Sequence, residues 1–244
     1  MHRFIRSNRW FRYAPLAVLL WIGNVAAQDL APFTAAYALK RGGMKIGDVQ
    51  RELRQGTNGT LVLTSRSKPT GLAAMFVKDV IAESSTWIWH DKRPRPLEYT
   101  YDRSGGKRER HVKLTFDWET KAVTNDISGD AWKMEVPPDA LDKLLYQLVL
   151  MLDLRTAAES FQYEIADGGK MKDYHFKVEG EETLNTALGN LKTRKLVRRR
   201  DDRTTTIWCA EAYGYLPVKI EQNEEDHGML QLVIQSVTGI EKAP

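Results

Sequence analysis

A two-residue alternation of apolar and polar side chains runs through much of this 244-residue chain and limits the folds that it can adopt. In residues 112–118, for example, Val, Leu, Phe and Trp at the even positions alternate with Lys, Thr and Asp at the odd ones. A β-strand points successive side chains to opposite faces, so this period is typical of half-buried strands. The same pattern recurs over residues 33–39, 45–53, 80–89, 97–101, 161–165, 174–178, 191–199, 204–210, 216–220 and 230–234.

Turn residues separate these segments at short intervals. Asn58-Gly59 and Ser104-Gly105-Gly106 are two such signals in the first half, and the Gly168-Gly169 pair and the stretch Arg200–Arg203 are two in the second. Short turns between alternating segments join successive strands into antiparallel hairpins. We therefore expect a mainly β protein whose strands form a curved meander, either an open barrel or a β-spiral.

One segment has helical spacing. After Pro137-Pro138-Asp139, leucines fall at positions 141, 144, 145, 148 and 152, which predicts a helix near 139–153 with Asp139 and Asp142 at its N-terminal end. Its later turns are apolar nearly all round, which indicates deep burial. We expect the sheet to pack around this helix, and a second apolar stretch, 71–77, to form a short helix or loop at the barrel mouth.

The first 27 residues read as a cleavable secretory signal. Arg3, Arg6, Arg9 and Arg12 precede an apolar run and a small-residue site that ends at Ala27. The apolar run is too short to span a bilayer, and no later segment approaches transmembrane length. We therefore expect residues 28–244 to form a single β-rich domain in the periplasm of a Gram-negative bacterium.

Removal of this segment changes the charge balance. The chain has 36 Lys and Arg against 32 Asp and Glu, and the four arginines of residues 1–27 account for the whole excess. Residues 28–244 carry no net charge, so the basic field typical of nucleic-acid-binding proteins is absent and no nucleic-acid partner is expected. Cys209 is the single cysteine, which excludes an intramolecular disulfide and is interpreted as a packing residue.

Residues 86–102, TWIWHDKRPRPLEYTYD, hold the densest group of aromatic side chains. The aromatics occupy the alternate positions that face the core in a strand. His90-Asp91 and the cations fall at the turn between two strands or on the faces opposite to the aromatics. Seven residues are the candidates for lining a ligand cavity, with an ordinary filled core as the alternative: Trp87, Trp89, Tyr99, Tyr101, Phe116, Trp118 and Leu148.

No motif for catalysis, metal binding or a cofactor is found. His111 and His175 alternate out of phase with apolar neighbours, which indicates solvent exposure, and His227 lies in a glycine-containing turn. Gly168-Gly169-Lys170 lacks the glycine spacing and the Ser or Thr of a phosphate loop. We therefore predict no catalytic residues, no metal and no cofactor.

Several short sequence motifs occur in an order that resembles the domain of unknown function 3108 family. They are Tyr37-x(8)-Ile46-Gly47, Arg95-Pro96-Leu97-Glu98-Tyr99, Phe116-Asp117-Trp118, the apolar segment after Asp139, Ile165-Ala166-Asp167-Gly168, Tyr174-x-Phe176, Gly180-Glu181-Glu182-x-Leu184-x-Thr186-x-Leu188-Gly189, Ile207-Trp208-x-Ala210 and Tyr215-Leu216-Pro217-Val218-Lys219-Ile220. The resemblance implies an exported antiparallel β protein with no catalytic residues to carry over. The one-helix arrangement is also similar to open-barrel lipoprotein carriers, an analogy of architecture alone.

Three functions follow as hypotheses. The first is a non-enzymatic envelope protein that binds a lipid-like or other apolar ligand, or a protein partner, in its concave β surface. The second is an envelope scaffold or assembly protein that acts through exposed edge strands. The third is a hydrolase of envelope polymers, which requires carboxylates or a histidine to converge, for instance Asp117, Glu181 and His175.

Overall fold

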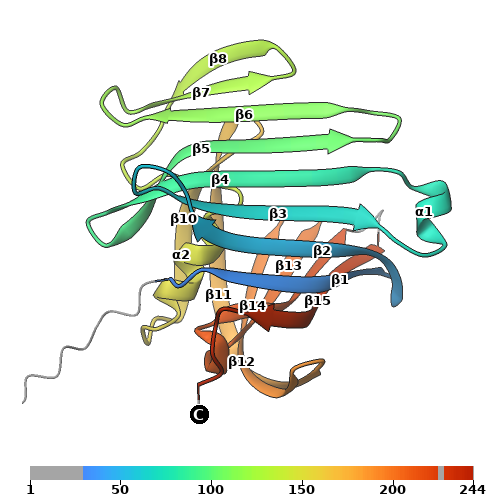
Figure 1. Ribbon diagram of the computed structural model, residues 1–244. Coiled ribbons are helices and arrows are strands. Elements are labelled where there is room, and N and C mark those ends of the chain that lie inside the picture. Colours follow the sequence, from blue (N-terminus) through green and yellow to red (C-terminus); the bar gives the residue numbers. More distant parts are fainter. Residues whose placement is uncertain (1–29, 225–227, 244) are drawn as a thin grey trace, which may run out of the picture.

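The protein is mainly β, and one continuous sheet runs through it (Figure 1). The computed structural model describes residues 30–224 and 228–243. Fifteen strands follow the order β8-β7-β6-β5-β4-β3-β2-β1-β15-β14-β13-β12-β11-β10-β9, so nearly every strand pairs with its neighbours in sequence. This confirms the predicted curved meander. The predicted signal segment 1–27 and His227 lie outside the described residues.

The first eight strands and the short helix between them are β1 (Phe33–Arg41), β2 (Met44–Gln55), β3 (Leu61–Pro69), α1 (Ala73–Phe76), β4 (Val80–His90), β5 (Arg93–Ser104), β6 (Arg110–Asp117), β7 (Ala122–Ile127) and β8 (Asp130–Glu135). The rest of the chain forms β9 (Leu141–Asp142), α2 (Tyr146–Asp153), β10 (Ser160–Asp167), β11 (Lys170–Thr186), β12 (Gly189–Arg200), β13 (Arg203–Ala210), the 3₁₀ turn η1 (Glu211–Tyr213), β14 (Leu216–Glu224) and β15 (Gly228–Thr238).

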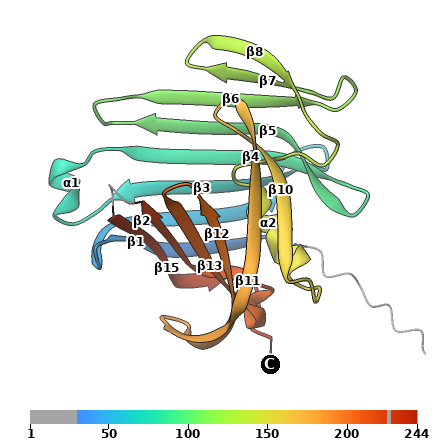
Figure 2. The same cartoon turned by 180° about the vertical axis from the view of Figure 1, so that it is seen from behind.

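The sheet curls into an open barrel around α2. Strands β1–β8 form one wall, which we call the front wall, and β10–β13 cross behind it at a steep angle as the back wall (Figures 1 and 2). The antiparallel pairing places the hairpin turns at 42–43, 105–109, 168–169 and 201–202 at one rim, which we call the mouth. Helix α2 lies in the half of the interior away from the mouth.

The two ends of the sheet do not pair with each other, but side chains narrow the gap between them. Trp132 on β8 packs against Gly169 in the β10–β11 turn, where an added Cβ would overlap the indole ring. Gly169 also has a φ of +77°, a left-handed conformation that favours glycine. Glycine is thus required at this position by two independent constraints.

Helix α2 is shorter than predicted. It covers Tyr146–Asp153 instead of 139–153, because Leu141–Asp142 forms β9, which pairs in parallel with Ile165–Ala166 of β10. Asp142 ends this strand, and its Oδ1 accepts hydrogen bonds of 2.8 Å from the backbone N–H groups of Leu144 and Leu145. The leucine spacing of residues 141–152 therefore spans a strand, a capped turn and a helix.

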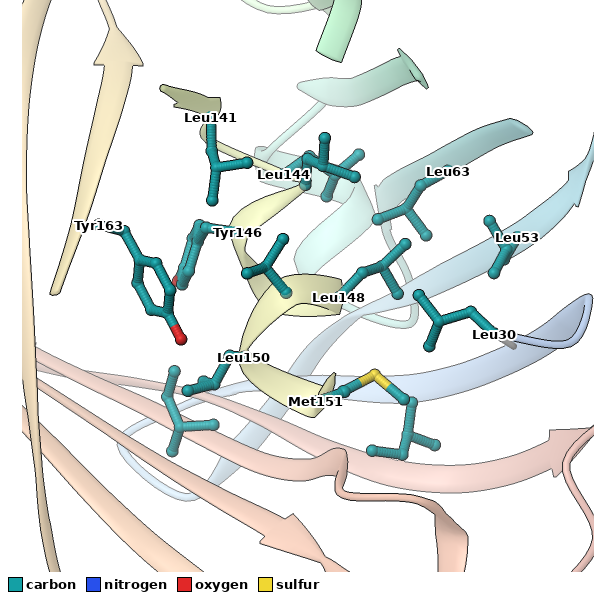
Figure 3. Packing of buried hydrophobic residues seen from close by; sticks show 14 of the residues in the cluster. Leu30, Leu53, Leu63, Leu141, Leu144, Tyr146, Leu148, Leu150, Met151 and Tyr163 are labelled. Carbon is teal, nitrogen blue, oxygen red and sulfur yellow. The ribbon is translucent and has the colours of Figure 1, made fainter. Parts of the chain in front are cut away.

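The core is built around this helix, as expected from its apolar surface. Leu148, Leu150 and Met151 of α2 are buried against β1, β3 and the back wall (Figure 3). Tyr146 stacks on Phe176 with ring centres 5.9 Å apart and approaches the edge of Tyr174 at 5.3 Å. Aromatic contacts of this kind add to the hydrophobic contribution of burial. Helix and sheet together form one filled apolar core.

Two strands were not expected from the sequence. Ala122–Ile127 (β7) and Asp130–Glu135 (β8) extend the front wall beyond β6. Most side chains of β8 are exposed on both faces, so its sequence carries little of the alternation that marks the other strands. The expected short helix in 71–77 is present as α1.

Candidate functional site

The seven predicted cavity-lining residues all belong to, or pack against, the apolar core. Trp87, Tyr99, Phe116 and Leu148 are buried within it. Trp89, Tyr101 and Trp118 are partly exposed at its margin. Around Trp87, Phe116 and Leu148 the filled-core alternative therefore describes the packing, whereas Tyr99, Tyr101 and Trp118 border small cavities.

Two small cavities touch these marginal residues. Tyr101, with Tyr99, lines a cavity of about 130 Å³ that also contacts Lys143 and Asp167. Trp118 lines another of about 230 Å³ beside β10 and Pro138. The indole of Trp118 stacks on Phe116 and donates a 2.7 Å hydrogen bond to the carbonyl of Pro96. Trp118 is thus fixed in position while one side of it stays accessible.

The residues weighed for catalysis do not converge within the described chain. His175 is exposed on the outer face of β11, and Glu181 forms a surface ion pair of 2.9 Å with Lys192. Asp117 accepts hydrogen bonds from the backbone of Glu119 and Thr120. This set gives no support to the hydrolase alternative.

His90 and Asp91 lie where predicted, at the β4–β5 turn. Asp91 and Lys92 have φ angles of 48° and 63°, as expected for the central residues of a tight hairpin turn. Cys209 is buried, and burial raises the pKa of its thiol far above the usual value. It is a packing residue, as expected.

A layer of buried polar groups separates the apolar core from the mouth. Ser85 donates a 2.5 Å hydrogen bond to Asp142, and Tyr99 donates one of 2.7 Å to Glu83. Burial is the main cause that raises the pKa of Asp142 to about 6, against the hydrogen bonds that lower it. For Lys143, burial lowers the pKa, but the carboxylates of Glu83 and Asp167 outweigh it and raise the pKa overall.

Arg198 is the only basic side chain in the described residues that is more than nine-tenths buried, with 9% exposure. Its guanidinium carbon lies 3.7 Å from the centre of the Tyr174 ring, a stacking geometry favoured by the planar cation. Its Nε is buried and has no hydrogen-bond partner within the described part of the chain. Buried charges in proteins are normally paired, so this cation is unusual.

Arg198 faces a polar cavity of about 260 Å³ near the mouth. The lining residues are Asp167, Lys172, Tyr174, Arg198, Arg200, Asp201, Asp202 and Arg203. Two of the carboxylates already have cationic partners: Asp167 with Lys172 at 2.7 Å, and Asp201 with Arg200 at 3.6 Å. The third carboxylate, Asp202, lines the same cavity, and no hydrogen bond or ion pair joins Arg198 to any of the three among the described residues. The planar guanidinium of Arg198 suits a carboxylate or phosphate group of a ligand.

An apolar row leads across the inner face to this arginine. The strand registers place Leu39, Leu232, Ile220, Ile207 and Leu196 side by side on β1, β15, β14, β13 and β12. The first three are partly exposed, and we call them the inner stripe. Arg198 lies two residues beyond Leu196 toward the mouth, on the same face. Four strand spacings of about 4.8 Å make the row roughly 19 Å long.

The sequence interpretation did not single out Arg198. It has the same parity as Leu196 on β12 and points inward. The sequence did hold a sign of this: a cation at a position that alternates with the apolar, inward-facing residues of a strand.

Comparison with known proteins places the chain in a family without assigning an activity. A search of curated proteins gives no match. Among solved structures, the chain is similar to a β-barrel-like protein of domain of unknown function DUF1849 from Brucella abortus. The TM-score is 0.59 at 8% sequence identity, and the match covers 85% of this chain and 97% of the other. At this identity the likeness shows a shared fold.

The family model described as "Protein of unknown function (DUF3108)" matches residues 33–234. The match runs from the first residue of β1 into β15 and so includes α2, Arg198 and the whole inner stripe. The chain belongs to the DUF3108 family.

Proposed function

We propose that this is an exported protein of the periplasm that binds a lipid-like ligand without catalysing a reaction. The ligand is an amphiphile with an acidic group. Its apolar chain lies along the inner stripe, and its acidic group is held by Arg198. The single observation that carries the proposal is the buried Arg198 at the end of an apolar row, with an Nε that has no hydrogen-bond partner among the described residues.

The geometry favours an amphiphile over a purely apolar ligand. The half of the interior around α2 is filled, and the cavity between Tyr37, Leu63 and Leu148 measures only about 10 Å³. The polar cavity lies in front of Arg198, and the inner stripe on the same face of the sheet is partly exposed, so a cationic and an apolar surface are both accessible. Only a ligand with an apolar chain and an acidic group contacts the apolar and the cationic surface at the same time.

Native mass spectrometry of the exported protein, followed by lipid extraction, tests this function. We expect a bound species whose extract contains an acidic amphiphile, and we expect it to be depleted in Arg198→Met. Arg199→Met is the matched control, because Arg199 is exposed and pairs with Glu179 at 2.8 Å. Consistent absence of any bound molecule from the wild-type protein would contradict the proposal.

A second candidate function, an envelope scaffold, is favoured by one observation. The outer edge of β10 pairs with β9 only at Ile165 and Ala166, so residues 160–164 have no strand partner on that edge within the described chain. Free edges of this kind accept an added strand from another protein. A photo-crosslinker at Gln162 would capture an envelope protein in this case, and one on the outer face at His175 would not. Equal labelling from both positions would contradict the scaffold function.

A further inference from the structure

Exposed apolar side chains gather at one corner of the mouth. The described chain has seven large hydrophobic residues that are strongly exposed, and six of them lie in or next to α1 and the β1–β2 turn: Met44, Leu72, Met75, Phe76, Val77 and Met229. The backbone N–H of Gly42 donates to the carbonyl of Met229, which places Met229 beside that turn. We call Met44, Leu72, Met75, Phe76 and Val77 the apolar corner.

The segment 71–77 presents these side chains outward and does not pack them. Phe76 is 84% exposed and Leu72 79% exposed, and no residue of α1 is buried. A one-turn helix is nevertheless formed, with hydrogen bonds from Met75 to Leu72 and from Val77 to Ala73. An ordered segment that exposes several large apolar side chains together is typical of an interaction site.

Cations surround the apolar corner. Lys68 precedes α1 and Lys78 follows it, and both are exposed. The β5–β6 turn packs directly against Lys78, since a Cβ on Gly105 would lie 2.6 Å from the Lys78 carbonyl oxygen. This contact brings the exposed Lys107 and Arg108 to the same corner.

The nearby acids do not cancel this charge. Asp79 is engaged by Arg103 at 2.7 Å, and Glu109 in the β5–β6 turn is one exposed acid beside four exposed cations. These cations, Lys68, Lys78, Lys107 and Arg108, make no ion pair within the described residues. The apolar corner therefore has a cationic border even though residues 28–244 have no net charge.

The corner stands clear of the rest of the molecule. Helix α1, the β1–β2 turn and the β5–β6 turn project together from the same side of the front wall (Figure 1). A membrane surface that approaches from this side can therefore reach all three elements. Apolar side chains that enter the interface of a bilayer, bordered by Lys and Arg that contact anionic headgroups, form a recognised mode of peripheral binding.

We propose that the apolar corner docks the protein on an anionic membrane surface, with Leu72, Met75 and Phe76 entering the interfacial region. The charge of the border selects the lipid surface over a neutral protein partner. Docking in this orientation turns the mouth, and with it the cavity of Arg198, toward the membrane. The inference rests on the exposed corner alone and stands whether or not Arg198 binds a ligand.

Vesicle co-sedimentation of the exported protein tests this proposal. Vesicles of phosphatidylcholine and phosphatidylglycerol at 3:1 are compared with vesicles of phosphatidylcholine alone. We expect binding to the anionic vesicles, and partitioning at least about tenfold weaker for the double variant Leu72→Ser, Phe76→Ser. Because both side chains are exposed, thermal unfolding of this variant should match the wild type.

Two double variants test whether the cations at the apolar corner, and not the net charge of the protein, control binding to the vesicles. Lys78→Glu with Lys107→Glu should weaken binding to anionic vesicles. Lys92→Glu with Lys121→Glu, exposed in the β4–β5 and β6–β7 turns at the opposite rim, should leave it unchanged at the same net charge. Arg198→Met should bind vesicles as the wild type does, which separates docking from ligand binding.

Three results would overturn the proposal: no binding to anionic vesicles, equal loss of binding in the Lys92 and Lys121 control, or a Leu72- and Phe76-dependent dimer in sedimentation equilibrium. The last result would assign the corner to a second copy of the chain.

Discussion

The hydroxyl of Ser85 on β4 donates a 2.5 Å hydrogen bond to the carboxylate of Asp142, and both residues are fully buried. The other carboxylate oxygen accepts the backbone N–H groups of Leu144 and Leu145. One acidic side chain thus joins the front wall to the turn that starts α2. This bond orients the helix around which the barrel packs, and it makes the stability of the fold depend on the ionisation of Asp142.

The first prediction concerns pH. Burial raises the pKa of Asp142 from 3.8 to about 6 in the folded protein, so between these values the folded state holds a proton that the unfolded state has lost. The contribution of Asp142 to stability is therefore fully present below pH 4 and is lost as pH rises through 6, by about 3 kcal/mol in total. Urea unfolding of wild type and Asp142→Asn at pH 4, 5, 6 and 7 measures it.

The difference in stability between wild type and Asp142→Asn should fall across this window and stay constant above it. Asp117→Asn serves as the control. The pKa of Asp117 is lowered by its hydrogen bonds, the one to the backbone of Thr120 first, so its contribution is lost as pH falls instead. A difference for Asp142 that does not change between pH 4 and 7 would refute the prediction.

The second prediction concerns the gap between the ends of the sheet. Gly169→Ala introduces a side chain at positive φ and also displaces the Trp132 ring, and we expect it to cost about 2–3 kcal/mol. Gly168→Ala should cost about 1 kcal/mol, because Gly168 has a φ of +63° and no atom within contact distance of an added Cβ. Chemical unfolding of both variants gives the comparison.

A Trp132→Ala background should reduce the cost of Gly169→Ala to that of Gly168→Ala, since only backbone strain then remains. If the cost were the same with and without the indole, the two ends of the sheet would not be coupled through this contact.

The third prediction distinguishes a filled core from a cavity around α2. Leu148 is buried between the helix and the front wall, so Leu148→Ala should cost about 2–5 kcal/mol. Leu152 on the same helix is only partly buried, and Leu152→Ala should cost clearly less. Equal small costs for both variants in equilibrium unfolding would mean that Leu148 borders open space.

Much of the fold could be predicted because most strands are half-buried, and burial on one face leaves a period of two in the sequence. Turns such as Gly168-Gly169 and Asp201-Asp202 also carry their own local signals. The sequence of strand β8 lacks the two-residue alternation because most of its side chains are exposed on both faces. The start of α2 was misplaced because Asp142 caps a turn at the position where a helix N-terminus was expected.

The candidate site was harder to predict for a physical reason. The sequence pattern is the same whether an apolar side chain fills a core or lines a pocket. It shows which face of a strand or helix the side chain is on, and not the space in front of it. This holds for the four buried candidates Trp87, Tyr99, Phe116 and Leu148. The pairing of Ser85 with Asp142 and the stacking of Arg198 on Tyr174 join residues far apart in sequence. Such contacts are set by the curvature of the sheet.

A calorimetric titration with two ligands of equal chain length, dodecyl phosphate and dodecanol, tests whether Arg198 holds the acidic group of a bound amphiphile. The wild type should bind dodecyl phosphate more tightly, and Arg198→Met should weaken that binding by about 10- to 100-fold, the value of a charge-assisted hydrogen bond. Binding of dodecanol by Arg198→Met, and of both ligands by Arg199→Met, should match the wild type. Unchanged affinity of Arg198→Met for dodecyl phosphate, or no binding of either ligand to the wild type, would contradict the account.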